Sequence, residues 1–322
     1  MSQDIAAITC FFSYAKNPHS VQRYKEFKAR LKRQGVDLYT IELAFFDEDY
    51  LLDEDVYLRL RTDTVLWHKE SLLNILAKRL PPHIKKIAWL DCDIEIADEA
   101  WPAKVSKLLN EYKVVQLGRE HLYLAPNGRI ERKHSTLGYG LHSGAKDWGN
   151  YAKYHPGLGW ASSRELFSSY GGLFEYGLSG GADGMMGYIF GGGAKTGDND
   201  MKDWILPRKY KLYEECVPSM IDKLREFRDK TVEYVNGSVT YLDSTIWHKY
   251  HAPQRRRGYL SRPNILKGID LYKDLKKDDF GLFKWKDMRY NLVFKKFFSM
   301  KDKQEGLQSN ISYEKVNIEN IL

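Results

Sequence analysis

The stretch that decides the fold is Lys85-Lys-Ile-Ala-Trp-Leu-Asp91-Cys-Asp93-Ile-Glu-Ile96. An apolar run, typical of a buried strand, leads directly into two carboxylates separated by one residue. Side chains repeat every second residue along a strand, so Asp91 and Asp93 point the same way if the strand continues through them. Carboxylate oxygens on one side of a strand end suit Mg²⁺ or Mn²⁺. The stretch predicts a divalent metal site, with a capped polar strand end as the alternative.

Length and composition place this strand in a globular protein. The chain has 322 residues, of which 43% are hydrophobic and 14% aromatic, enough for one large domain or two small ones and too apolar for a disordered chain. The formal net charge of +7 permits a phosphate-bearing partner. A mildly basic surface explains the same charge and is the favoured interpretation.

Cysteine usage and hydropathy indicate the compartment. Cys10, Cys92 and Cys216 are isolated and odd in number, which favours neither a disulfide framework nor a zinc cluster and fits a reducing environment. The N-terminal residues lack the pattern of a signal peptide, and no apolar run reaches membrane-spanning length. We therefore expect a soluble, cytoplasmic protein, and the oligomeric state stays open.

The N-terminal third predicts a parallel α/β sheet. An apolar strand over residues 5–12 is followed by a helix over 19–34, which Gly35 ends, and by an alternating strand over 36–43. A strand–helix–strand order of this kind favours parallel pairing. Because ligands bind at the carboxyl ends of such strands, the loop Ser13 to Asn17 is a candidate binding segment.

The elements around the central stretch are also helices and strands. We predict helices over 67–80 and 101–112 and a strand over 113–117. Glu70 and Asn74 lie one turn apart on the first of these helices. Either could face a ligand, although solvated positions or local hydrogen bonds are the favoured interpretation.

The middle of the chain is rich in glycine. Residues 118–153 are polar and irregular, and we expect a long functional loop region there rather than a core element. Residues 155–164 are expected to open a helix over 165–170. The run 171–184 then indicates backbone that turns sharply or approaches a ligand closely. It matches neither the dinucleotide-binding fingerprint nor the phosphate-binding P-loop.

A predicted strand over residues 239–247 leads into His248-Lys-Tyr-His251. Two histidines at this spacing are usually structural, but beside paired aspartates one of them becomes a credible third protein ligand. The basic run 255–257 follows. It is either a solvated turn or a phosphate-binding segment, because guanidinium groups match phosphate geometry.

Asp183 stands on the glycine-rich run. It is either a turn residue that tolerates unusual backbone angles, or a general base for an acceptor hydroxyl or a binder of sugar hydroxyls. Taken together, these segments describe a metal–diphosphate site beside an acceptor pocket. A divalent ion that bridges a nucleoside diphosphate stabilises it as a leaving group, which is nucleotide-sugar chemistry.

In this order the segments resemble GT-A fold glycosyltransferases, in particular a bacterial and phage-type group with a D-x-D motif. The resemblance covers roughly residues 5–290 and is carried by the first strand and its loop, Ile87 to Asp93, His155-Pro-Gly-Leu-Gly-Trp160, Gly180-Gly-Ala-Asp183, His248 to His251, and Arg257-Gly-Tyr259. It implies one α/β domain with a central, mainly parallel mixed sheet flanked by helices over residues 1–265. A helical extension over 266–322 would pack on it, with a polar end after Met300 that is compatible with partial disorder.

The resemblance also implies site roles. A nucleotide-sugar donor, with UDP-sugar favoured, and Mn²⁺ or Mg²⁺ would be bound. Asp91 and Asp93 would meet the metal with His248 or His251, and Asp183 would be catalytic. Residues expected at the donor are Ser13, Tyr14, Asn17, Asp91, Cys92, Trp160 and Arg257. In this chain Ala252 stands where the family often has glycine, which leaves the choice of metal histidine open.

Three functions follow as hypotheses. The first is a hexosyltransferase-like glycosyltransferase acting on a saccharide or on another hydroxyl acceptor, such as a hydroxymethylated base in DNA. The second is a nucleotide- or nucleic-acid-binding protein without transfer activity. The third is a metal-dependent phosphatase or nuclease, although a phosphatase D-x-D normally follows the first strand and here the motif comes late.

Overall fold

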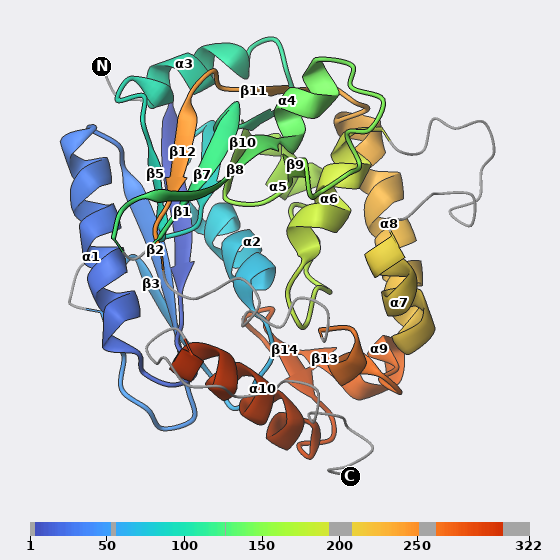
Figure 1. The fold of residues 1–322 in the computed structure, drawn as a ribbon. Helices are drawn as coiled ribbons and strands as arrows, with labels where there is room; N and C mark the ends of the chain where they lie inside the picture. The colour runs from blue at the N-terminus through green and yellow to red at the C-terminus, as the bar shows by residue number, and fades with distance from the viewer. Residues whose placement is uncertain (1–3, 53–55, 126, 193–207, 251–261, 305–322) are drawn as a thin grey trace.

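The computed structural model describes residues 4–52, 56–125, 127–192, 208–250 and 262–304, and the account below concerns these residues. A seven-stranded sheet forms the centre of the molecule, with the strand order β11-β6-β10-β4-β1-β2-β3 (Figure 1). Its strands are β1 (Ile5–Phe11), β2 (Leu38–Phe45), β3 (Leu58–Thr62), β4 (Lys86–Leu90), β6 (Val114–Gln116), β10 (Gly159–Ser163) and β11 (Val239–Tyr241).

The sheet is mixed but mainly parallel. Strand β10 runs antiparallel to β4 and β6, whereas β1 pairs in parallel with β2 and β4, β2 with β3, and β6 with β11. The expected α/β class with a central, mainly parallel sheet flanked by helices is therefore confirmed. The antiparallel β10 lies in the segment 155–164, for which we predicted no strand, and the helix expected over 165–170 follows it at residues 165–169.

Both faces of the central sheet are buried, because successive side chains of β1 belong to different cores. Ala6 and Ile8 join the core that contains helix α2, while Ile5 and Ala7 join the core under α1 and α3. A parallel sheet covered on both faces needs apolar residues at consecutive positions, as this strand has. The flanking helices are α1 (Pro18–Arg33), α2 (Lys69–Arg79), α3 (Trp101–Leu108), α5 (Glu165–Ser169), α6 (Ala182–Phe190), α7 (Arg208–Cys216) and α8 (Pro218–Tyr234).

A second sheet overturns the expectation of a loop region over residues 118–153. Its order is β5-β12-β7-β8-β9. The members are β5 (Ile94–Ile96), β7 (Glu120–Leu124), β8 (Ile130–Thr136), β9 (Tyr154–His155) and β12 (Thr245–His248), and helix α4 (Leu137–His142) follows β8. Strand β8 is mostly exposed, so its side chains show no apolar alternation. Strand β7 pairs with β12 from far along the chain, and such pairing leaves no local signal.

The predicted strand over 239–247 is likewise two strands, one in each sheet. Strand β11 ends at Tyr241 and lies at the edge of the central sheet, and β12 begins at Thr245 in the second sheet. The break carries the chain from one sheet to the other. It brings His248 beside β5, the strand that follows Asp93.

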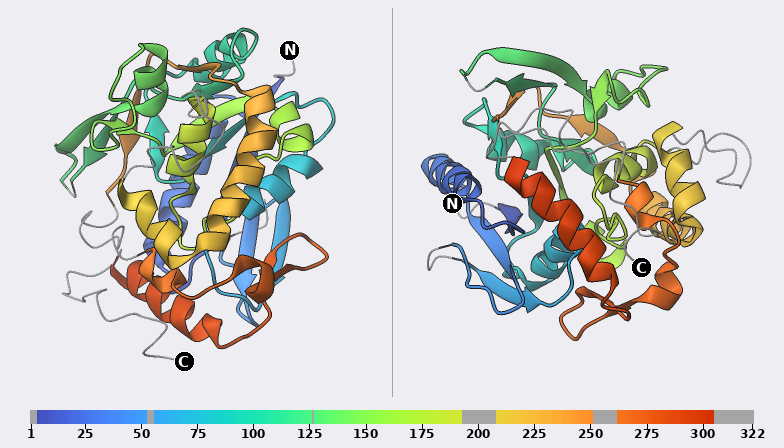
Figure 2. Two further views of the ribbon diagram at one scale, coloured as in Figure 1. Left: turned by 90° about the vertical axis from the view of Figure 1, so that its right-hand side faces the viewer. Right: turned by 60° about the horizontal axis from the view of Figure 1, so that its bottom comes forward.

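The C-terminal segment contains a hairpin as well as helices. Its elements are η2 (Asn264–Leu266), α9 (Leu271–Asp274), β13 (Leu275–Lys277), β14 (Phe283–Trp285) and α10 (Tyr290–Gln304). Helix α10 lies across one end of the molecule, opposite α3 (Figures 1 and 2). Its residues Phe294 and Phe298 belong to the same core cluster as strand residues such as Ile8.

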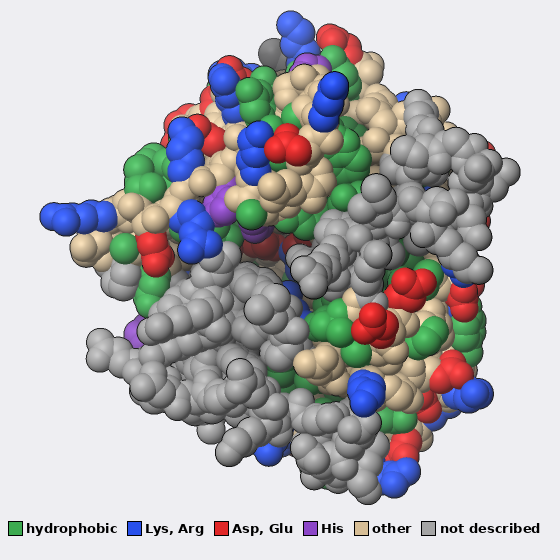
Figure 3. Space-filling view, turned by 45° about the vertical axis from the view of Figure 1, so that its right-hand side comes forward, with side chains coloured by type: hydrophobic (Ala, Val, Ile, Leu, Met, Phe, Trp, Pro, Cys, Tyr) green, Lys and Arg blue, Asp and Glu red, His purple; other side chains and the backbone are tan. Residues whose placement is uncertain are grey.

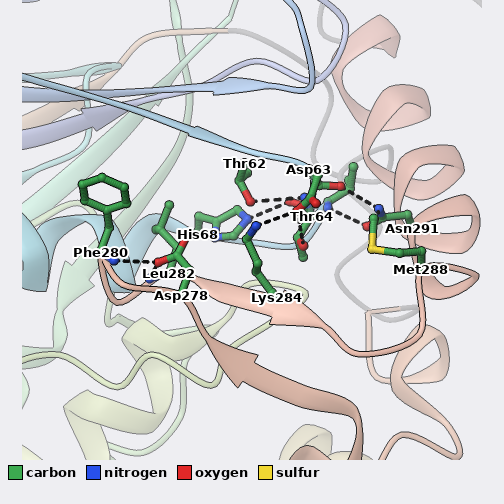
Figure 4. A network of polar contacts seen from close by, with 11 residues as sticks. Thr62, Asp63, Thr64, His68, Asp278, Phe280, Leu282, Lys284, Met288 and Asn291 are labelled. Atoms are coloured by element: carbon green, nitrogen blue, oxygen red, sulfur yellow. Dashed lines mark hydrogen bonds and ion pairs between the residues drawn. The ribbon is translucent and has the colours of Figure 1, made fainter.

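Polar contacts tie α10 to the segment that precedes α2 (Figure 4). The Asn291 side chain accepts a hydrogen bond from the Val65 amide at 2.8 Å and donates one to the Asp63 carbonyl at 2.7 Å. His68 contacts the Thr64 carbonyl at 2.9 Å. These contacts fix the residues directly before Lys69, so the C-terminal segment helps to position the start of α2. Among the described helices, none has the length and apolarity needed to cross a membrane.

Candidate functional site

A cavity of about 300 Å³ opens at the carboxyl ends of β1 and β4. This is the size of a small-ligand site and the edge where ligands bind in α/β sheets. Acidic, basic and histidine side chains gather around a hollow on the face drawn in Figure 3. The cavity-lining residues with charged or titratable side chains are Cys10, Tyr14, Arg23, Lys69, Glu70, Asp91, Cys92, Asp93, Tyr123, His155, Asp183, His248 and Arg262.

The loop between β1 and α1 forms one wall of this cavity. Asn17 is the N-cap of α1: its side chain accepts a hydrogen bond from the His19 amide, and its own amide donates to Ser13 Oγ at 3.0 Å. The Tyr14 hydroxyl donates to the Leu66 carbonyl at 2.7 Å, and its ring stacks on Phe298 with centroids 4.5 Å apart. Ser13, Tyr14 and Asn17 all line the cavity, so the predicted nucleotide loop lies at its edge with its side chains held in place.

Lys69 joins two of the predicted acidic residues. Its Nζ lies 2.6 Å from Asp91 Oδ1 and 3.5 Å from Asp183 Oδ1, and its side chain is 12% exposed. Burial would lower the pKa of Lys69, but Asp183 and Asp91 outweigh it and hold the pKa well above the ordinary value. We call Lys69, Asp91 and Asp183 the lysine cluster. This cluster could not be predicted from the sequence, because its three members come from α2, the end of β4 and α6.

Burial raises the pKa of Asp91 to about 6, although the Lys69 ammonium opposes the rise. The Asp91 carboxyl is therefore less acidic than an exposed aspartate. Strand β4 ends at Leu90, so Asp91 and Asp93 stand in the turn before β5 rather than on a continuous strand. In agreement with this turn, the two side chains have different partners: Asp91 faces Lys69, and Asp93 faces His248.

Two glycines place Asp183. Gly180 and Gly181 have φ angles of 89° and 95°, the left-handed region that glycine enters without a steric penalty. Gly181 is the N-cap of α6, so Asp183 falls in the first turn of that helix, where backbone N–H groups favour a carboxylate. A Cβ added at Gly157 would lie 3.4 Å from Asp183 Oδ2, so a bare backbone stands next to this oxygen.

Asp93 and His248 form a second cluster, which we call the histidine pair. His248 Nε2 lies 3.4 Å from Asp93 Oδ2, and the histidine is 3% exposed. Two neighbouring ligands of one divalent ion, each bound at about 2.1 Å, stand roughly 3 Å apart, so this histidine pair fits two positions of a metal site. Among the described residues, no group of three or more His, Cys, Asp or Glu side chains is arranged to hold a metal. A metal here would need diphosphate or water oxygens for its remaining positions.

Tyr123 and His155 are cavity residues that sequence reasoning missed, because both lie in or beside the region expected to be loop. The Tyr123 hydroxyl lies 3.2 Å from His155 Nε2, and the Tyr123 ring packs edge-on against His248 with centroids 4.7 Å apart. His155 Nδ1 accepts a hydrogen bond from the Gly157 amide at 3.1 Å. An imidazole that accepts at Nδ1 carries its proton at Nε2, so neutral His155 donates to Tyr123.

Glu70 lies in the cavity wall on α2 and is 2% exposed. Burial raises its pKa to about 8 despite the neighbouring Lys69, and Asp183 and Asp91 raise it further. The sequence allowed Glu70 to face a ligand but favoured solvation or local hydrogen bonds, and the residue is not solvated. An amphipathic helix pattern cannot show that a glutamate faces a cavity, because the cavity is formed by other segments.

The remaining predicted site residues have different locations. Cys92 lines the cavity, and burial, followed by the Asp93 charge, raises its thiol pKa to about 12. Trp160 is absent from the described cavity lining; it is 2% exposed, and its indole donates to the Pro156 carbonyl at 2.7 Å. His251 and Arg257, like the whole basic run 255–257, lie outside the described residues.

No protein-family model matches the sequence, and no curated protein matches it either. Among solved structures, a mutant of Drosophila β1,4-galactosyltransferase 7 in complex with manganese, UDP-Gal and xylobiose is 17% identical, with a TM-score of 0.32 over 57% of this chain and 59% of that one. The catalytic domain of the same enzyme with xylobiose is 19% identical, with a TM-score of 0.30 over 57% and 58%.

A putative glucose-1-phosphate thymidylyltransferase from Bacillus anthracis in complex with sucrose is 9% identical, with a TM-score of 0.33 over 83% of this chain and 96% of that one. The match to the two galactosyltransferase chains, in contrast, spans less than two thirds of their length. At these TM-scores the likenesses carry no argument about function, which has to come from the site itself.

Proposed function

We propose that this protein is a metal-dependent glycosyltransferase that moves a sugar from a nucleoside-diphosphate sugar to a hydroxyl acceptor. One observation carries the proposal: a single cavity is lined by the loop before α1, by Asp91 and Asp93, by Asp183 and by His248. These residues come from segments far apart in the sequence, and each has a separate task in sugar transfer. A UDP-sugar is the favoured donor.

The lysine cluster supports a base role for Asp183. Its Oδ1 faces the Lys69 ammonium at 3.5 Å, which holds the carboxylate in one orientation, and its Oδ2 lies beside Gly157, which has no side chain. In the proposed reaction, Asp183 takes the proton of the acceptor hydroxyl as that oxygen bonds to the anomeric carbon. The bond between the anomeric carbon and the diphosphate oxygen breaks, and its electron pair leaves with the nucleoside diphosphate.

The histidine pair supports a place for the diphosphate. Mn²⁺ or Mg²⁺ held by Asp93 and His248 would neutralise the charge that develops on the departing diphosphate. The Tyr123 ring against His248 would keep the imidazole oriented. His251 is a further candidate ligand. Ser13, Tyr14 and Asn17 would contact the nucleotide, with Arg257 on the phosphates, and Asp91 and Cys92 would lie beside the donor.

The acceptor is a saccharide or a hydroxymethylated base in DNA. A DNA acceptor would make binding to duplex DNA weaken as salt concentration rises, because phosphate contacts release counterions. Binding that salt does not affect would remove DNA from the possible acceptors. Trp160 remains proposed near the donor sugar, where its buried indole would act through the Pro156 backbone it holds.

The test is nucleotide binding with and without Mn²⁺, measured by calorimetry on the wild-type protein and on Asp93→Ala. We expect UDP to bind more tightly with Mn²⁺, and the variant to lose that gain. Asp243→Ala is the matched control, because the Asp243 side chain is 76% exposed and lies outside the cavity lining. Metal-independent binding in both proteins would contradict the proposal, and rapid hydrolysis of simple phosphate esters would indicate a phosphatase instead.

A further inference from the structure

The Glu70 carboxyl is a buried group with one oxygen that forms no hydrogen bond within the described part of the fold. The residue is 2% exposed and lies in the cavity wall, and its Oε2 has no hydrogen-bond partner among the described residues. Buried polar atoms in folded proteins are nearly always hydrogen-bonded, because leaving one unsatisfied costs about 1–3 kcal/mol. An exception at the wall of a ligand cavity points to a partner that the ligand brings.

Two other buried polar side chains show what a satisfied group looks like in this fold. Asn74, one turn further along α2, accepts from the Leu173 amide at 2.8 Å and donates to the Leu173 carbonyl at 2.9 Å. Glu42 is 1% exposed, and its Oε1 accepts from the Leu52 amide at 2.9 Å while its Oε2 faces Arg59 Nε at 3.2 Å. Both serve the fold, and neither lines the cavity.

The position of Glu70 indicates which part of a ligand it meets. The next residue towards the N-terminus, Lys69, reaches both Asp91 and Asp183. In the proposed reaction the transferred sugar lies between the acceptor hydroxyl at Asp183 and the diphosphate at Asp93. Glu70 lines the same cavity as Asp93 and Asp183, and a sugar ring supplies hydroxyl or amino donors that a carboxyl oxygen accepts.

We propose that Glu70 is a specificity-determining residue that accepts a hydrogen bond from a hydroxyl or amino group of the transferred sugar through Oε2. This inference rests on the proposed function. A buried group that is completed only by one ligand donor discriminates strongly, because a sugar without that donor leaves the carboxyl unsatisfied. Glu70 thereby selects among nucleotide sugars that share the same nucleotide.

The experiment compares UDP with a panel of UDP-sugars in Mn²⁺, namely UDP-glucose, UDP-galactose, UDP-N-acetylglucosamine and UDP-glucuronate. Calorimetry gives Kd for wild type, Glu70→Gln and Glu70→Leu. We expect the best sugar to bind wild type about tenfold more tightly than the poorest, since leaving the buried carboxyl unsatisfied costs about that factor. Glu70→Leu should lose this ranking, whereas Glu70→Gln keeps an acceptor oxygen and should retain part of it. The Kd of UDP itself should stay unchanged.

Thermal unfolding separates a ligand role from a structural one. We expect Glu70→Leu to raise the Tm of the free protein, on the order of 2 °C, because it removes an unsatisfied buried group. Glu42→Gln is the matched control and should lower Tm, because it weakens a satisfied buried carboxylate. A lower Tm for Glu70→Leu, or an unchanged sugar ranking in Glu70→Leu, would overturn the inference.

The failure of this inference differs from the failure of the proposed function. A wild-type protein that binds UDP but gains nothing from any attached sugar overturns the role of Glu70 and leaves the nucleotide site standing. A wild-type protein that binds no nucleoside diphosphate, with or without Mn²⁺, overturns the proposed function and this inference together.

Discussion

Asp91 and Asp93 are two residues apart and line the same cavity, yet they belong to different clusters. Asp91 faces an ammonium group, Lys69 Nζ, at 2.6 Å, and through it lies near Asp183. Asp93 faces an imidazole, His248 Nε2, at 3.4 Å. The lysine cluster already contains its own cation, whereas the histidine pair combines a carboxylate with an imidazole, two groups that bind metal ions in proteins.

The two aspartates of a D-x-D motif therefore need not act as one unit. A carboxylate oxygen that is already held by a lysine has less to offer a metal ion, because the ammonium competes for the same oxygen. The imidazole beside Asp93 is, in contrast, itself a metal-ligand group, so Asp93 and His248 can serve the same ion. We therefore expect Asp93 to be the principal metal ligand and Asp91 to hold Lys69 and Asp183 in place.

The largest expected effect lies in the lysine cluster, at Asp183. Asp183→Asn keeps the shape of the side chain but removes the base, so kcat should fall by about 10²–10⁴. The Kd for UDP with Mn²⁺ should stay the same, because the histidine pair is untouched. Steady-state kinetics and calorimetry on the same preparation measure both quantities. Asp147→Asn, at a side chain that is 53% exposed, is the control, and an unchanged kcat for Asp183→Asn would remove it from the base role.

The next effect separates the two aspartates directly. Asp93→Asn and His248→Ala should each weaken Mn²⁺ binding by at least about 10–100-fold, which is the typical cost of changing a residue around a metal site. Asp91→Asn should leave Mn²⁺ affinity within about threefold of wild type. Titration of free Mn²⁺ by electron paramagnetic resonance measures this without any turnover. Equal losses of Mn²⁺ affinity in Asp91→Asn and Asp93→Asn would mean that both aspartates bind the metal ion.

Much of the scaffold around these clusters was predictable. Helices α1 and α2 and strands β1, β2, β4 and β6 follow the predicted segments to within a few residues, because their apolar residues recur at regular spacing and Gly35 or Pro81 ends a helix. Strand β10 could not be predicted in the same way. It is short and glycine-containing, and it is stabilised by pairing on both edges with β4 and β6.

The candidate site was predictable only in part. Asp91, Asp93, Asp183 and His248 carry chemistry that a sequence displays, and all four line the cavity. Lys69 was not predicted, because a lysine near a helix N-terminus ordinarily faces solvent and its partners lie 22 and 114 residues away. Tyr123 and His155 were missed because the second sheet was expected to be loop, and that sheet depends on contacts between distant segments.

A smaller effect concerns the coupling between Lys69 and Asp91. Breaking this partly buried ion pair from either side should lower the free energy of unfolding, because the other charge loses a partner. A double-mutant cycle with Lys69→Met and Asp91→Asn should give a coupling energy of roughly 1–3 kcal/mol. Urea denaturation of the four proteins measures it. Additive effects would mean that the pair is not coupled and would weaken the separation of the two clusters.

Lys69→Arg is the conservative control for that cycle. It keeps the positive charge but not the compact shape of the ammonium, so it should retain part of the coupling to Asp91. The same cycle with Lys69→Met and Asp93→Asn should show little coupling. A coupling to Asp93 as large as that to Asp91 would join the two clusters into one.

The smallest effect is the pH dependence that Glu70 gives to stability. Its pKa is raised to about 8, first by burial and then by Asp183 and Asp91, with Lys69 opposing. A carboxyl whose pKa is higher in the folded state stabilises the fold below its ordinary pKa of 4.5, and that contribution is lost as pH rises through about 8. The Tm of Glu70→Gln, which cannot ionise, should therefore gain on wild type between pH 5 and pH 8.5.

Asp91 also titrates in this window, with a pKa of about 6, but it does so in both proteins. The difference in Tm between Glu70→Gln and wild type therefore reports the ionisation of Glu70 together with its effect on Asp91. Scanning calorimetry at half-unit pH steps measures it. A difference that stays constant across the window would mean that Glu70 ionises like an exposed glutamate. The Glu70 carboxyl would then have to be solvated or paired in the folded protein.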